Sequence, residues 1–365
     1  MDNPSRDPIY VTRTSLPDIK EYSELLQRMF TTRQLTNNGE FARSLEERLQ
    51  TWLGVPHVAM CANGTLALQL GLHVGGLAGK EVITTPFTYA ATLTSLLWEG
   101  CNVVFADIEE ETCCLDPRSV ASKLTPETAG VLAVHTYGNA CDVEAFEQMG
   151  RAEDLLIFYD AAHAFGSIYK GRSLLDYGDI AACSTHATKI FHTGEGGFLV
   201  SHDIVDHEAF LAMRACGHFG DSHVRPGINA KLSELHAAMG CCLLDKTPAN
   251  IEARKQVSSH YDAMLPSGKL RRMHSRAGLT YNYAYYPVIL ETERALNQVV
   301  ARLRQHNIYP RRYFFPALNT LPYLKAKQPC PIAESVSRRV LCLPLYADLE
   351  ESTVETIADV FRKTL

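Results

Sequence analysis

The sequence predicts an α/β protein with a mostly parallel central sheet in a large domain and a small α+β domain at the C-terminal end. Short apolar runs rich in Val, Ile and aromatic residues recur after about residue 55, and helix-like stretches separate them. This alternation is typical of βαβ units, whose parallel strands are buried on both faces. The 365 residues suffice for two domains. We expect the large domain to span residues 1–245 and the small domain residues 246–365.

The N-terminal part is predicted to be helical up to about residue 55, because Leu45, Leu49 and Leu53 lie four residues apart and Gly54 follows as a stop signal. Strands of the large sheet are expected in the apolar runs 57–62, 81–86, 102–108, 130–138, 155–160, 180–186 and 196–202. The segment between the last two runs is predicted to form a loop presented by the sheet.

The C-terminal part also alternates between helical and strand-like patterns. Residues 230–264 are predicted to be helical, with a break at Pro248 and Asn250. Beyond them, strand-like runs at 283–290, 312–318 and 340–346 alternate with helical stretches at 292–306 and 350–364. This pattern indicates a small α+β domain.

Composition excludes several classes of protein. Apolar residues make up 46% of the chain and charged residues 21%, which excludes disorder as the main state. The net charge is −6 and no long basic run occurs, so a nucleic-acid partner is not expected. The odd number of cysteines, 11, indicates reduced thiols. The polar N-terminus and the lack of a long apolar run predict a cytoplasmic protein without a membrane partner.

A first candidate site lies where an apolar strand runs into Asn63, Gly64 and Thr65 before a helical pattern. Backbone N–H groups at a helix N-terminus bind phosphate, and the Thr65 hydroxyl adds a donor. Ser184, at the end of a later strand, is a further donor. A simple helix cap is the alternative interpretation of the first segment.

A second candidate site follows the strand that ends in Asp160. A carboxylate at the C-terminal edge of a parallel sheet lies where such folds bind ligands, and it can pair with the protonated ring nitrogen of a cofactor. A cap of the following turn explains Asp160 equally well. His163 is either a core histidine or a cofactor contact, and Tyr89, at another strand end, either stacks on a flat cofactor or packs in the core.

The third candidate is Lys189, which stands among small, aromatic and glycine residues between two buried strands. A lysine in such a place has a lowered pKa and can form a Schiff base with a carbonyl group. The nearby Cys183, His186 and His192 do not have the spacing of a zinc site, so no metal is expected.

Taken together, these segments strongly resemble the DegT/StrS family of nucleotide-sugar aminotransferases, pyridoxal phosphate (PLP) enzymes of the aspartate aminotransferase fold. The resemblance spans nearly the whole chain. Its motifs occur in family order: NGT (63–65), PFTYAAT (86–92), VHTYGNACD (134–142), DAAHAFG (160–166), HATKIFHTGEGG (186–197), GINAKLSELHAAMG (227–240) and RVLCLPLY (339–346).

The resemblance implies a role for each candidate residue. Lys189 would bond covalently to PLP and move a proton between donor and cofactor. Asp160 would keep the pyridine nitrogen protonated, Tyr89 would stack on the ring, and His163 would contact the ring edge near the phenolic oxygen. His186, three residues before the lysine, would contact substrate or cofactor, the alternative being a packed strand residue.

For the phosphate, the resemblance implies Gly64, Thr65 and Ser184 as ligands. It also implies that Asn229 reaches the phosphate from the neighbouring subunit, which predicts a homodimer with shared active sites. Lys231 would assist with an anionic group. The family often has Pro-Leu-His after its aromatic run, whereas RYFFPAL here has Ala317 and Leu318, so this sequence departs from the family at the expected donor or sugar contact.

The resemblance implies glutamate as amino donor and a nucleotide-linked keto sugar as acceptor. The HATK form of the lysine motif resembles the branch that aminates C-4 of dTDP-4-keto-6-deoxyhexoses. A C-3 aminotransferase and a non-catalytic nucleotide-sugar sensor are the alternatives. A related sugar dehydratase is disfavoured, because those enzymes replace the lysine with histidine.

Overall fold

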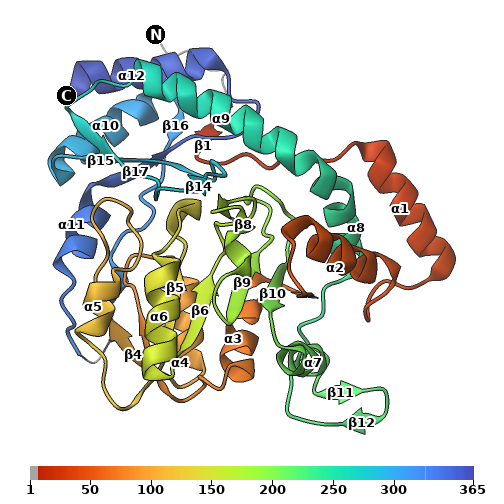
Figure 1. The fold of residues 1–365 in the computed structure, drawn as a ribbon. Coiled ribbons are helices and arrows are strands. Elements are labelled where there is room, and N and C mark those ends of the chain that lie inside the picture. The colour runs from red at the N-terminus through yellow and green to blue at the C-terminus, as the bar shows by residue number, and fades with distance from the viewer. Residues whose placement is uncertain (1–6, 325) are drawn as a thin grey trace.

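A computed structural model describes residues 7–324 and 326–365 of the chain (Figure 1). Its centre is a seven-stranded sheet in the order β2-β10-β9-β6-β5-β3-β4. The strands are β2 (His57–Cys61), β3 (Glu81–Thr84), β4 (Asn102–Phe105), β5 (Thr128–Val134), β6 (Leu156–Asp160), β9 (Ile180–Ser184) and β10 (Gly197–Ser201). Only β10 runs antiparallel to its two neighbours. The predicted mostly parallel sheet is confirmed.

Helices cover both faces of this sheet and extend beyond it (Figure 1). They are α1 (Ile19–Thr32), α2 (Glu40–Leu53), α3 (Gly64–Val74), α4 (Ala90–Trp98), α5 (Pro117–Ala121), α6 (Val143–Glu153), α7 (Ile204–Met213) and α8 (Glu234–Leu243). The predicted stop after α2 is present, since Gly54 ends the helix with a φ of 68°. That left-handed conformation favours glycine.

The side chains of β5 show how the two faces are packed. Val131 and Ala133 point into a core shared with α2 and α6, whereas Leu132 points into a second core shared with α3 and α4. Successive residues of a strand face opposite sides of a sheet. Burial on both faces explains why these strands are apolar runs without alternation.

The C-terminal part builds a smaller sheet, β13-β15-β17, with a core of its own. Its elements are α9 (Thr247–Met264), β13 (Leu270–Arg272), β15 (Tyr286–Leu290), α10 (Glu293–Gln305), β16 (Ile308–Tyr309), α11 (Pro331–Arg339), β17 (Val340–Leu343) and α12 (Glu351–Thr364). The predicted position of the helical break is wrong, because Pro248 and Asn250 both lie in α9, where a proline in the first turn is tolerated. The interruption falls just before them, in a 3-10 turn at Leu244–Lys246. The expected strand at 312–318 is wrong, because those residues form no strand and lead into a short 3-10 helix.

The remaining strands are short. β1 (Ile9–Tyr10) pairs with β16, so the start of the described chain lies against the C-terminal part. β7 (Ile168–Tyr169), β8 (Arg172–Ser173) and β14 (Leu279–Thr280) form a small sheet, and β11 (His218–Phe219) and β12 (Ser222–His223) form a hairpin. The domain boundary near residue 245 stays a prediction. Within the described ranges, no helix combines the length and apolar character needed to cross a membrane.

Candidate active site

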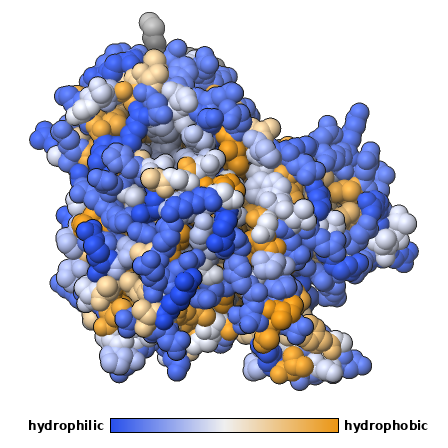
Figure 2. Space-filling model, viewed as in Figure 1, coloured by the Kyte–Doolittle hydropathy of each residue, from blue (hydrophilic) through white to orange (hydrophobic). Residues whose placement is uncertain are grey.

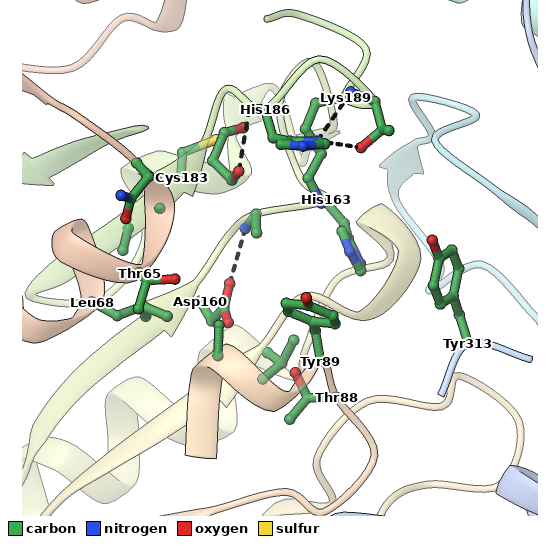
Figure 3. A pocket seen from close by; sticks show the side chains of 18 of the residues that line it. Thr65, Leu68, Thr88, Tyr89, Asp160, His163, Cys183, His186, Lys189 and Tyr313 are labelled. Atoms are coloured by element: carbon green, nitrogen blue, oxygen red, sulfur yellow. Dashed lines mark hydrogen bonds between the residues drawn. The ribbon is translucent and has the colours of Figure 1, made fainter. Parts of the chain in front are cut away.

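A cavity of about 510 Å³ lies at the carboxyl ends of the central strands (Figure 3). Strands β5, β6 and β9 end in its wall, and the N-terminus of α3 closes one side. Of the residues predicted from the sequence, those that line this cavity are Gly64, Thr65, Tyr89, Asp160, His163, Ser184, His186 and Lys189. Sequence segments more than a hundred residues apart therefore meet at one place, as expected for an open α/β sheet.

One end of the cavity is built for an anion. Gly64 and Thr65 form the first turn of α3, where backbone N–H groups have no carbonyl partner within the helix. Ser184 lies directly beside them, because a Cβ on Gly64 would come 2.8 Å from the Ser184 Cβ. The Asn63 side chain caps the helix by accepting from the Leu66 N–H at 2.9 Å. The capping and anion-binding interpretations are therefore compatible, since different groups serve each.

Asp160 is buried at the end of β6, with 5% of its surface exposed. Its carboxylate accepts from the Thr92 hydroxyl at 2.7 Å and from the Ala162 N–H at 3.1 Å. The Thr92 hydroxyl in turn lies 2.8 Å from that of Thr88. Burial raises the pKa of Asp160, and these two donors partly offset the rise. The result is an oriented carboxyl group able to share a proton with a basic ring nitrogen.

Lys189 lies in the loop between β9 and β10, with part of its surface accessible from the cavity. The loop is held by backbone hydrogen bonds, including the Lys189 N–H to the His186 carbonyl at 2.9 Å and the Ala187 N–H to the Gly194 carbonyl at 2.7 Å. Desolvation lowers the pKa of Lys189, and the charge of Asp160 opposes that shift. A larger fraction of this lysine is therefore the neutral nucleophile than of a surface lysine.

His163 is held as a neutral imidazole by its neighbours. Its Nδ1 accepts from the Tyr137 N–H at 3.1 Å, so the proton belongs on Nε2. Burial lowers the pKa of His163 well below its usual range, and the charge of Lys189 adds to the shift. The ring stacks parallel to Phe314 with 5.7 Å between centroids. A fixed N–H donor thus lines the cavity.

Tyr89 and His186 lie at more open positions. Tyr89 precedes α4 with 62% of its surface exposed, so it is not the packed core residue that was the alternative. His186 pairs through Nδ1 with the Thr188 hydroxyl at 2.8 Å, and its Nε2 lies 3.6 Å from a carboxylate oxygen of Glu195 (Figure 3). It too is exposed and lines the cavity.

Asn229 does not line the cavity of its own chain. It is exposed, and its side-chain oxygen accepts from the Lys231 ammonium group at 2.7 Å. Neither residue therefore contributes to the site within one chain, and their predicted roles both depend on a second subunit.

Several residues of the site escaped sequence reasoning. Thr92, which orients Asp160, lay inside a quoted motif in the first turn of α4. Its spacing of four from Thr88, which lies just before the helix, was the available signal. Tyr285, Arg311, Tyr313 and Phe314 line the opposite wall of the cavity. Tyr313 and Phe314 come from the run 312–318, which was expected to be a strand, and Arg311 directly precedes it. Tyr285 comes from the run 283–290. No local pattern indicated that these residues meet at one cavity.

The geometry fits PLP. An anion-binding helix N-terminus suits the phosphate, a buried carboxyl suits the pyridine nitrogen, and an amine of lowered pKa suits the carbonyl carbon. An amine and a carboxyl facing one cavity at the edge of a mostly parallel sheet are features of aminotransferases of the aspartate aminotransferase fold.

Comparisons with known proteins give the same result. The model of the DegT/DnrJ/EryC1/StrS aminotransferase family matches residues 18–362. The dTDP-4-amino-4,6-dideoxy-D-glucose transaminase of Shigella dysenteriae is 33% identical over 98% of this chain and 99% of its own. The crystal structure of DesI in the presence of its TDP-sugar product has a TM-score of 0.93 at 32% identity, covering 98% of this chain and 93% of DesI. The PLP form of Spr1654 from Streptococcus pneumoniae shares the fold, with a TM-score of 0.89 at 24% identity, covering 98% of this chain and all of that one.

The chain belongs to the DegT/DnrJ/EryC1/StrS aminotransferase family. The resemblance found in the sequence is confirmed, as are the fold class and the sugar aminotransferase activity with PLP as cofactor. The roles of individual site residues stay predictions.

Proposed function

We propose that this protein transfers the amino group of glutamate to C-4 of dTDP-4-keto-6-deoxyglucose, which yields the 4-amino-4,6-dideoxy sugar. The observation that carries the proposal is the 33% identity, over nearly the full length of both chains, to a transaminase named for that product. The TDP-sugar product in the DesI structure supports the same class of substrate.

PLP supplies a carbonyl carbon for covalent attachment and a ring that accepts electrons. Lys189 provides the neutral amine for attachment, because desolvation lowers its pKa, and the same amine carries the proton. Asp160 holds a proton at the ring nitrogen through a carboxyl that Thr92 orients. Both residues lie in one cavity, which is what the proposed proton transfers require.

The remaining residues bind and orient. Gly64, Thr65 and Ser184 hold the phosphate at the α3 N-terminus. His163 would direct its Nε2–H group at the edge of the cofactor ring, and the exposed Tyr89 would stack on the ring. His186 is placed to contact the substrate at the cavity wall.

The protein acts as a cytoplasmic homodimer in this proposal. The exposed apolar side chains Ile204, Val205, Phe219 and Val224 support a second copy of the chain as partner. The first two belong to α7, Phe219 lies in the β11–β12 hairpin and Val224 directly follows it. Figure 2 shows hydrophobic residues gathered on the surface in this region. Asn229, exposed close to this hairpin in sequence, would complete the phosphate site of the neighbour.

The test incubates purified protein with glutamate and, in separate reactions, dTDP-4-keto-6-deoxyglucose, its GDP-linked analogue and a 3-keto nucleotide sugar. We expect release of 2-oxoglutarate with the first sugar, and an equatorial or axial amine at C-4 in the NMR spectrum of the product. Preference for the 3-keto sugar would replace the C-4 proposal by the C-3 alternative. Failure of the PLP to convert to its amine form with glutamate would contradict glutamate as donor.

A further inference from the structure

Arg311 is held rigidly at the wall of the active-site cavity. Its N–H donates to the Cys342 carbonyl at 3.2 Å, and its carbonyl accepts from the Cys342 N–H at 2.8 Å. These bonds fix the backbone of Arg311 to β17. The guanidinium group lies 5.5 Å from the centre of the Tyr313 ring, an arrangement that orients the side chain by a cation–π contact. Both residues line the cavity that contains Lys189.

The Arg311 guanidinium forms no ion pair or hydrogen bond with any residue in the described ranges. Arg312, the next residue, is different. Its guanidinium pairs with Glu293 at 2.8 Å, donates to the Arg338 carbonyl at 2.9 Å and packs on the Phe315 ring at 3.5 Å. The two adjacent arginines therefore differ. Arg312 pairs with protein groups through its Nη2 atom, although its Nε is buried without a partner. No donor of the Arg311 guanidinium is taken by a described residue, so all of them are available to a ligand.

The charge of the cavity favours a ligand at Arg311. Among the described lining residues, Lys189 and Arg311 are the two strongly basic side chains, and the acidic ones are Asp160 and Glu195. The proposed mechanism assigns Lys189 and Asp160 to the cofactor. Arg311 is then the one strongly basic side chain of the described lining that is left for an anionic substrate. A guanidinium offers paired N–H groups that match the two oxygens of a carboxylate or a phosphate.

We infer that Arg311 is the oxyanion receptor of the substrates, an inference that rests on the proposed function. Both proposed substrates carry oxyanions, the carboxylates of glutamate and the diphosphate of the nucleotide sugar. They enter the same cavity in turn, so one guanidinium can receive either. Because the Arg311 guanidinium has no hydrogen bond or ion pair with the described residues to give up, binding costs little reorganisation of the wall.

The test measures binding rather than turnover. The PLP-loaded enzyme is titrated by calorimetry with 2-oxoglutarate, which has the carboxylates of the donor but no amine, and separately with dTDP. The variants are Arg311→Gln, Arg311→Lys and the matched control Arg312→Gln. We expect Arg311→Gln to raise the Kd of at least one probe about 10- to 100-fold, the usual loss for a charge-assisted hydrogen bond. The Kd of Arg311→Lys should lie between those of the wild type and Arg311→Gln. Arg312→Gln should change the Kd less than about twofold while lowering the Tm.

The two probes distinguish the source of the oxyanion. If Arg311→Gln weakens only the binding of 2-oxoglutarate, Arg311 binds the donor. If it weakens only the binding of dTDP, Arg311 binds the nucleotide. If it weakens both, Arg311 is a shared receptor. Unchanged Kd values for both probes in Arg311→Gln would overturn the inference, as would a wild type that binds neither. A wild type that binds both probes but makes no amino sugar would contradict the proposed function, while the ratio of Kd values would still decide the role of Arg311.

Discussion

The two walls of the cavity differ in origin and in chemistry. One wall comes from the ends of β6 and β9 and carries Asp160 and Lys189 on a sheet buried on both faces. The other comes from residues 311–314, an irregular segment that follows β16 and carries Arg311, Tyr313 and Phe314. The sheet wall holds a buried carboxyl of raised pKa and an amine of lowered pKa, and the opposite wall holds aromatic rings and a cation without an ion pair to the described residues. Under our two proposals, the first wall carries the groups that move protons and the second carries the arginine that binds the substrate oxyanion.

Replacing Lys189 should produce the largest effect and sharpen this division. Lys189→Ala removes the amine that attacks and carries the proton, so we expect the half-reaction with glutamate to slow at least about a thousand-fold. Stopped-flow absorbance of the cofactor measures the rate. Binding of dTDP at the opposite wall should stay within about twofold of wild type.

The matched control is Lys170→Ala, since Lys170 is a surface lysine paired with Glu144 and lies outside the cavity. Borohydride reduction should also attach the cofactor to the peptide that contains Lys189 in the wild type. Attachment to another peptide, or near-normal turnover of Lys189→Ala, would remove the basis of the assignment.

Replacing Asp160 should affect rate more than cofactor binding. An amide does not hold a proton on the ring nitrogen as a carboxylate does, so Asp160→Asn should slow the glutamate half-reaction about a hundred-fold, or about 2.7 kcal/mol. Thr92→Val removes the hydroxyl that donates to Asp160 and should slow the glutamate half-reaction about tenfold. Rates come from single-turnover absorbance and PLP affinity from equilibrium dialysis. If Asp160→Asn lost PLP affinity and kept its rate, Asp160 would be a structural cap.

Asn229 tests whether a third contribution comes from the neighbouring chain. If Asn229 completes the neighbour's site, a mixed dimer of Asn229→Ala and Lys189→Ala contains one site with both defects and one intact site. Random pairing of equal amounts makes half the dimers mixed, so activity should rise to about a quarter of wild type. Activity is measured after subunit exchange, with mass spectrometry to verify mixed dimers. No rise in the presence of mixed dimers would place Asn229 outside a shared site.

The residues of one wall could be predicted from the sequence, and those of the other could not. The sheet wall was predictable, because strand ends of a parallel sheet meet at one edge and polar residues at those ends stand out against apolar runs. Asp160 and Ser184 are examples. The opposite wall was not predictable, since residues 312–318 have the apolar and aromatic composition of a strand but do not form a strand. Arg311 and Arg312 are indistinguishable in the sequence, and only tertiary contacts give one a partner and leave the other free for a ligand.

The smallest effect concerns His135, a buried histidine whose backbone is hydrogen-bonded to that of Asp160. His135 follows β5, and its N–H donates to the Asp160 carbonyl at 3.1 Å. Its Nδ1 accepts from the Cys141 N–H at 3.2 Å, and burial lowers the pKa of His135 to about 3. In the unfolded chain the pKa is about 6.5, so the unfolded state binds more protons between these values and stability falls as pH falls below about 6.5. Between pH 7 and pH 5 this one group should reduce the free energy of unfolding by about 2 kcal/mol.

His135→Asn tests that figure, because the asparagine oxygen can accept from Cys141 but does not titrate. Urea unfolding of wild type and variant at pH 5, 6 and 7 gives the slope of stability against pH for each. We expect the loss on acidification to be smaller in the variant by about 2 kcal/mol, with the glutamate half-reaction at pH 7 within about threefold of wild type. The surface variant His73→Asn, which removes an exposed pair with Glu99, should leave the slope within about 0.5 kcal/mol of wild type. Equal slopes in wild type and His135→Asn would mean that His135 takes up its proton at the same pH in the folded and the unfolded protein, which would contradict the lowered pKa.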